Sequence, residues 1–237
     1  MSRRSFFVAI GIVVLLGGML GTGLLLLLRY EPAYYGEALP PEGEQRQRQS
    51  KEFLTEFSEL QSNLNLPEWS ARFTDQQINS FLNEAFAQIG LGEKLLPEGI
   101  SDLRVAFEPE HMRLAFRYRG GLVNTVVSVT LRFWLPRTET NVLAVQLESF
   151  RAGLVPFTAQ WLLEHISETA RQNGIEVTWY RHEGHPVALV RFQADQARST
   201  LQFKGVQFEQ GQVIIHGRST EGRAALPSSS RALAVRD

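Results

Sequence analysis

The sequence predicts an α+β domain behind an N-terminal transmembrane helix. Three patterns support this prediction: an uncharged apolar stretch over residues 6–28, apolar residues at helical spacing in two segments before residue 90, and alternating apolar residues from Leu103 onward. Helical and strand periodicities are therefore separated along the chain, with hairpin-like turns between the strands. This separation is typical of α+β folds with antiparallel sheets.

Residues 6–28 contain no charged side chain. At a rise of ~1.5 Å per residue they would reach about 34 Å, enough to cross a hydrocarbon core of ~30 Å. A secretory signal peptide has a shorter apolar region and a small-residue cleavage site, which is absent around Arg29. We therefore expect an uncleaved signal-anchor helix after a short cytoplasmic start at residues 1–5.

The residues on either side of this stretch predict its orientation. Arg3 and Arg4 precede it, whereas acidic residues outnumber basic ones directly after it. The positive-inside rule then places the amino terminus in the cytoplasm and the remaining domain outside, as in a single-pass protein of the cell membrane. Gly17 and Gly21 form a G-x-x-x-G pattern that would let two helices approach closely in a homodimer. Glycine also occurs in lone membrane helices, so a monomer is the alternative.

Residues 29–43 predict an extended linker, in which the proline- and glycine-rich run 31–43 spans at most about 40 Å. Residues 44–63 then carry apolar side chains at steps of three and four, which indicates an amphipathic helix. We favour a helix that covers the core, and a membrane-surface helix is the alternative. A second helix is expected from Thr74, where Gln77 completes a capping box, to Gly90.

The segments 103–108 and 112–118 alternate apolar and polar residues, as do the longer segments 123–135 and 142–150. They predict a long, twisted antiparallel meander of four strands. A helix over 156–172 should pack against this sheet. Two further hairpins are expected: residues 175–181 with 187–192, and residues 201–209 with 212–218, the latter with a bulge at Gly205. The exterior domain would span residues 44–218, and 219–237 would be a disordered tail.

Composition and motifs exclude several classes of function. The net charge is -1, so no overall positive field attracts nucleic acid, and the absence of cysteine excludes disulfides and thiolate metal sites. No phosphate-binding loop or serine nucleophile motif is present. His182 and His185 are the closest histidine pair, and we interpret them as residues of a polar turn rather than metal ligands. We predict no enzyme activity, no metal and no cofactor.

One loop differs from its surroundings, at Arg151, Gly153 and Pro156. We interpret it as structural: the glycine allows a positive φ, the proline opens the helix that follows, and Arg151 is a partner for a carboxylate or a helix end. Several strands also carry apolar residues on both faces. A curved sheet of this kind would leave an apolar groove beside the 156–172 helix, unless the predicted helices cover both faces.

Two patterns carry a resemblance to known proteins. The first is F-T-x-x-Q-I-N-x-F-L at Phe73 to Leu82, and the second is F-x-A-G-L-V-P-F at Phe150 to Phe157. With the N-terminal apolar stretch they resemble the YpmS-like bacterial membrane-anchored proteins of unknown function. Long twisted strands around a helix also resemble, more distantly, the tubular lipid-binding (TULIP) proteins. That resemblance implies an apolar ligand such as a membrane lipid, and neither supplies a catalytic residue.

These observations lead to one expectation and one alternative. We expect a membrane-anchored, outward-facing binding module that holds a lipid or other apolar ligand between a curved sheet and a helix. The alternative is a non-enzymatic scaffold or protein-interaction domain of the cell envelope.

Overall fold

The computed structural model describes residues 19, 21–88, 96–121, 123–137, 139–156, 160–172, 175–192 and 201–219. The labelled helices are α2 (Ala33–Glu37), α3 (Glu44–Asn63), α4 (Asp75–Gln88) and α6 (Gln160–Gln172). The strands are β1 (Glu68–Thr74), β2 (Ile100–Glu108), β3 (His111–Gly120), β4 (Val123–Trp134), β5 (Val142–Ala152), β6 (Val155–Pro156), β7 (Glu176–His182), β8 (His185–Arg191), β9 (Leu201–Glu209) and β10 (Gln212–Ser219).

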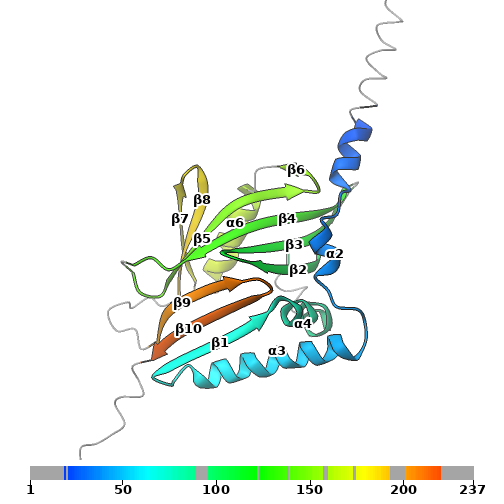
Figure 1. The fold of residues 1–237 in the computed structure, drawn as a ribbon. Coiled ribbons are helices and arrows are strands. Elements are labelled where there is room, and N and C mark those ends of the chain that lie inside the picture. Colours follow the sequence, from blue (N-terminus) through cyan, green and yellow to red (C-terminus); the bar gives the residue numbers. More distant parts are fainter. Residues whose placement is uncertain are drawn as a thin grey trace, which may run out of the picture.

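These strands form two antiparallel sheets, so the α+β class is confirmed (Figure 1). A seven-stranded sheet has the order β2-β3-β4-β5-β8-β7, with β6 paired to β5. A three-stranded sheet has the order β1-β10-β9 and lies beside α3 and α4.

The transmembrane part of the predicted fold is wrong. Within the described ranges, no helix is long and apolar enough to cross a membrane. Residues 21–28 are helical, and the carbonyl of Leu28 at the end of this piece accepts a hydrogen bond from Thr125 of the domain. Gly17 and the predicted start at 1–5 lie outside the described residues. Gly21 is exposed, and the space where its side chain would be is open.

Residues 29–43 differ from the extended linker that was predicted. They contain the short helix α2, from which Tyr35 is 5% exposed and packs between Ala115 and Val126 of the large sheet. Tertiary contacts of the tyrosine therefore stabilise a helix too short to form by itself.

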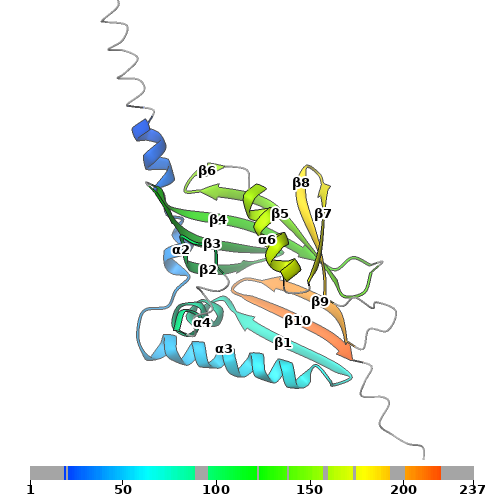
Figure 2. The ribbon, with the colours of Figure 1, turned by 180° about the vertical axis from the view of Figure 1, so that it is seen from behind.

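Helices α3 and α4 pack side by side against the three-stranded sheet (Figure 2). Phe53 and Leu60 of α3 contact the buried cluster around Phe73 and Val213, so the core-covering interpretation of α3 is confirmed. Helix α4 begins as the capping box predicts: Thr74 Oγ1 accepts a hydrogen bond of 3.2 Å from Gln77, whose Oε1 accepts one of 2.8 Å from the Thr74 amide.

Strand β1 was not predicted. It alternates buried Trp69 and Phe73 with exposed Glu68 and Arg72, and it pairs along its whole length with β10. On the other side of β10, the register shifts opposite Gly205, which confirms the predicted bulge. Because β1 and β10 come from distant parts of the sequence, this sheet joins both ends of the domain.

The predicted meander is confirmed as β2 to β5, and the β7–β8 hairpin extends it at the β5 edge. One face is apolar and contains a buried cluster of Phe116, Val127, Val129, Leu147, Phe150 and Ala152, against which Leu163 of α6 packs. Helix α6 lies across this face, and α2 lies over the other face (Figures 1 and 2). The expected packing of the helix on the sheet is therefore confirmed.

Two boundaries differ from the predictions. Pro156 does not open a helix, because it pairs with Arg151 in strand β6 and α6 begins at Gln160. Ser219, expected in the tail, is the last residue of β10 and pairs with Leu201. The rest of the tail, 220–237, lies outside the described residues.

Candidate functional site

The candidate binding groove lies between α6 and the β7–β8 hairpin. It has a volume of about 570 Å³, and its lining includes Leu163, Ser167, Trp179, Tyr180 and Pro186. The indole nitrogen of Trp179 donates a hydrogen bond of 2.7 Å to Ser167 Oγ, which in turn donates one of 2.7 Å to the Leu163 carbonyl. This chain of bonds fixes the indole ring against the helix and sets the width of the groove.

Apolar side chains remain accessible around this groove. Tyr180 of β7 lines the groove and is 39% exposed, whereas Ile166 of α6 lies outside the lining and is 42% exposed, although α6 is strongly amphipathic. The sheet therefore covers only part of the apolar side of the helix. Charged groups stand at the rim, where Arg171 lies 2.6 Å from Glu168. Hydrogen bonds from Gln172 and then Arg171 lower the pKa of the Glu168 carboxyl.

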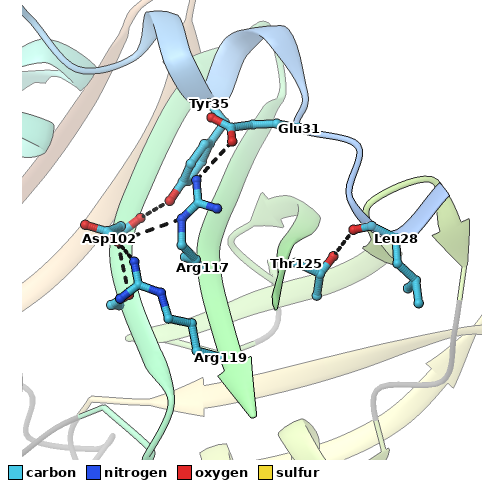
Figure 3. A network of polar contacts seen from close by, with 8 residues as sticks. Leu28, Glu31, Tyr35, Asp102, Arg117, Arg119 and Thr125 are labelled. Carbon is cyan, nitrogen blue, oxygen red and sulfur yellow. Dashed lines mark hydrogen bonds and ion pairs between the residues drawn. The ribbon is translucent and has the colours of Figure 1, made fainter. Parts of the chain in front are cut away.

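The segment between the N-terminal helical piece and α2 is attached to the sheet by polar contacts (Figure 3). Thr125 Oγ1 donates a hydrogen bond of 2.5 Å to the Leu28 carbonyl, and Arg117 forms an ion pair of 2.9 Å with Glu31. The Tyr35 hydroxyl donates a bond of 2.9 Å to the Asp102 carbonyl. Burial, followed by the nearby Asp102 carboxylate, raises the pKa of Tyr35, so its hydroxyl stays protonated at neutral pH.

The structural loop predicted at residues 151–156 lies next to this segment. Gly153 has a φ of 58°, and a Cβ there would overlap the backbone carbonyl oxygens of Leu27 and Leu28. Only glycine fits this position, both for its backbone conformation and for the close approach. Arg151 is exposed, and within the described residues no ion pair or hydrogen bond links it to a carboxylate. The expected partner of Arg151 is thus not found in this part of the chain.

A second cavity, of about 580 Å³, lies between residues 30–34 and strands β3 to β5. Its polar lining consists of Tyr30, Tyr34, Arg113, Ser128, Thr130, Ser149 and Arg151. Among these residues, Arg113 and the serine and threonine side chains were not singled out from the sequence. The alternation of the strands contained part of the signal, because Ser128 and Thr130 of β4, and Ser149 and Arg151 of β5, are two positions apart on their strands.

The histidines on the strands lie in separate parts of the large and small sheets. His182 and His185 are opposite each other where the β7–β8 hairpin turns, and His111 lies 3.1 Å from Glu148 on another strand. In the parts of the chain that the structure describes, no group of three histidine, aspartate or glutamate side chains could hold a metal ion.

Comparison with known proteins adds no relative. No protein family, curated protein or solved structure matches this chain. The resemblances to the YpmS-like and tubular lipid-binding proteins, and the location at a cell membrane, stay predictions from the sequence.

Proposed function

We propose that the protein is a non-enzymatic binding module that holds an acyl chain, or an apolar group of similar shape, in the groove between α6 and the β7–β8 hairpin. The observation that supports this proposal is a preformed groove of about 570 Å³ with apolar side chains on both walls, Leu163 on α6 and Trp179 and Tyr180 on β7. This volume lies within the usual range of small-molecule sites.

The chemistry of the groove favours an amphipathic ligand. Leu163, Trp179 and Tyr180 offer apolar surface to a chain, and burial of that surface is favourable by ~25 cal/mol per Å². Glu164, Arg171 and Arg181 along the rim keep water and a polar head group at the opening. A membrane lipid or a fatty acid has both parts.

A titration of the purified full chain with a fluorescent long-chain fatty acid tests this proposal. Tyr180→Ser removes apolar surface from one wall of the groove and should weaken binding about tenfold. The matched control is Leu54→Ser, since Leu54 is 45% exposed on α3, away from the groove. Absence of binding by the wild-type chain, or equal binding by the two variants, would contradict the proposal.

A protein-interaction domain is the second candidate, and a specific surface favours it. Leu54 and Phe57 of α3 are 45% and 43% exposed, although the same helix buries Phe53 in the core. Replacing both residues by serine should abolish crosslinking to a partner in cell extracts. If the crosslinked products are unchanged, α3 is not the interacting surface.

A further inference from the structure

The cavity between α2 and the large sheet places basic and hydroxyl side chains in a regular array. In the register of β3, β4 and β5, Arg113 is opposite Thr130, and Thr130 is opposite Ser149. Two residues along the strands, Ser128 is opposite Arg151. The two arginines thus stand at opposite corners of this array, with three hydroxyls between them.

The geometry lets both arginines reach one ligand. With strands ~4.8 Å apart and a rise of ~3.4 Å per residue, the Cα atoms at opposite corners are about 12 Å apart. Each arginine side chain spans roughly half of that distance. The corner beside Arg113 on β3 is Ala115, which is 0% exposed and packs against Tyr35, so the ligand would lie over the arginine and hydroxyl positions.

The charges in this cavity do not cancel. Arg113 is paired with Glu108 at 3.0 Å and lies under the Tyr34 ring, with its guanidinium 5.4 Å from the ring centre. Arg151 has no carboxylate within ion-pair distance among the described residues. Of the residues that line the cavity, none is acidic. Glu108 is therefore the carboxylate that competes with an incoming anion.

The hydroxyls are already ordered as hydrogen-bonding groups. Ser149 Oγ donates a bond of 2.9 Å to Thr130 Oγ1, and the Tyr34 hydroxyl is hydrogen-bonded to Ser128. Burial raises the pKa of Tyr34, against the opposing effect of Arg113, so the phenol remains a donor at neutral pH. Each of these hydroxyls can turn its proton toward an anion.

We propose that this cavity binds a phosphate group carried by a larger molecule, with Arg151 and Arg113 as the charged ligands and Ser128, Thr130 and Ser149 as neutral donors. Arginine and hydroxyl donors together match the tetrahedral oxygens of phosphate, and arginine provides a planar fork for bidentate contacts. The volume of about 580 Å³ leaves room for a small polyol beside the phosphate. The site is on the opposite face of the sheet from the α6 groove and does not depend on it.

The test uses the full chain with two probes that share the phosphate chemistry. Glycerol 3-phosphate is titrated by calorimetry, and vesicles of phosphatidylglycerol or of phosphatidylcholine are used in co-flotation. Binding of glycerol phosphate supports a soluble phosphorylated ligand, and binding only to phosphatidylglycerol vesicles supports a lipid head group. Failure to bind glycerol phosphate, together with equal binding to the two vesicle types, would overturn the proposal.

Three variants assign the binding to this cavity. Arg151→Gln should weaken the observed binding about 10- to 100-fold, because a charge-assisted contact is lost. Glu108→Gln removes the competing carboxylate and should strengthen binding several-fold. Arg119→Gln is the matched control: it is an arginine with a 61% exposed side chain on the same strand as Arg113, outside the cavity lining, and should bind as wild type. If Arg151→Gln binds as well as Arg119→Gln, the cavity is not the site.

Discussion

The hydroxyl of Tyr35 donates a hydrogen bond of 2.9 Å to the backbone carbonyl of Asp102, which lies 67 positions further along the chain. With the Glu31–Arg117 ion pair, this bond holds the segment before α3 on the sheet (Figure 3). The segment is thereby part of the folded domain. It also forms one wall of the cavity that contains Arg113 and Arg151.

Tyr35→Phe tests this attachment. The phenylalanine keeps the packing against Ala115 and loses the hydrogen bond, so we expect the free energy of unfolding to fall by about 1 kcal/mol. Urea denaturation measures this change. Tyr30→Phe is the control, because Tyr30 is 45% exposed, and it should unfold like wild type. Equal stability of the two variants would show that the bond to Asp102 contributes nothing.

Asn79→Ala should be among the most damaging substitutions. Asn79 is 0% exposed; its amide nitrogen donates to the carbonyls of Ala38 and Val105, and its oxygen accepts a bond of 2.8 Å from the Val105 amide. Alanine leaves these backbone groups buried without partners, at a cost of about 3 kcal/mol. Gln76→Ala, an exposed amide on the same helix, should stay within about 0.5 kcal/mol of wild type in thermal unfolding.

Gly153→Ala and Gly184→Ala separate backbone strain from steric overlap. Both glycines have a positive φ, 58° and 83°, but only at Gly153 would a Cβ overlap the Leu27 carbonyl oxygen. We expect Gly184→Ala to cost about 1 kcal/mol, from strain alone, and Gly153→Ala about 3 kcal/mol. Limited proteolysis should also cut the 21–37 segment faster in Gly153→Ala. Equal costs for the two variants would mean that the contact with Leu27 is not tight.

Asp75 should give the protein a distinct pH dependence. Burial raises the pKa of its carboxyl, against backbone hydrogen bonds from Phe107 and Gln76 that lower it. The folded state then binds the proton more readily than the unfolded state, so stability is lost as pH rises from about 3.9 through the raised pKa. Measured by urea denaturation, the stability of wild type relative to Asp75→Asn should decrease with pH in that window and then level off. An increase with pH would contradict this sign.

Local patterns predicted much of the fold. The capping box of Thr74 and Gln77 and the alternation in β2 to β5 depend on residues close in sequence, so they could be identified directly. The alternation of Trp69 and Phe73 in β1 was equally visible, but it runs straight into the helix cap and was not recognised. The sequence did not predict which sheet each hairpin joins. Alternation shows which face of a strand is buried, but not which strand lies next to it.

The sites were harder to predict because they depend on tertiary contacts. Helix α2 is too short for a periodic signal, and the burial of Tyr35 is what makes it form. The array around Arg151 requires the register of three strands, which is shifted between β4 and β5 where Thr130 gives way to Leu131. A shift of this kind has no fixed sequence pattern. Arg151 was singled out from its loop, but its neighbours across the sheet were not.

The pairing of β1 with β10 also determines when this protein can fold. Glu68 pairs with Arg218, 150 positions later in the sequence, so the three-stranded sheet cannot close until β10 has left the ribosome. Contacts of such long sequence separation slow folding, since a large loop must close before they form. Until then the apolar face around Phe73, together with the α3 and α4 side chains that pack on it, has no β10 to cover it. The nascent chain therefore exposes this apolar face, an aggregation hazard, until β10 has been synthesised.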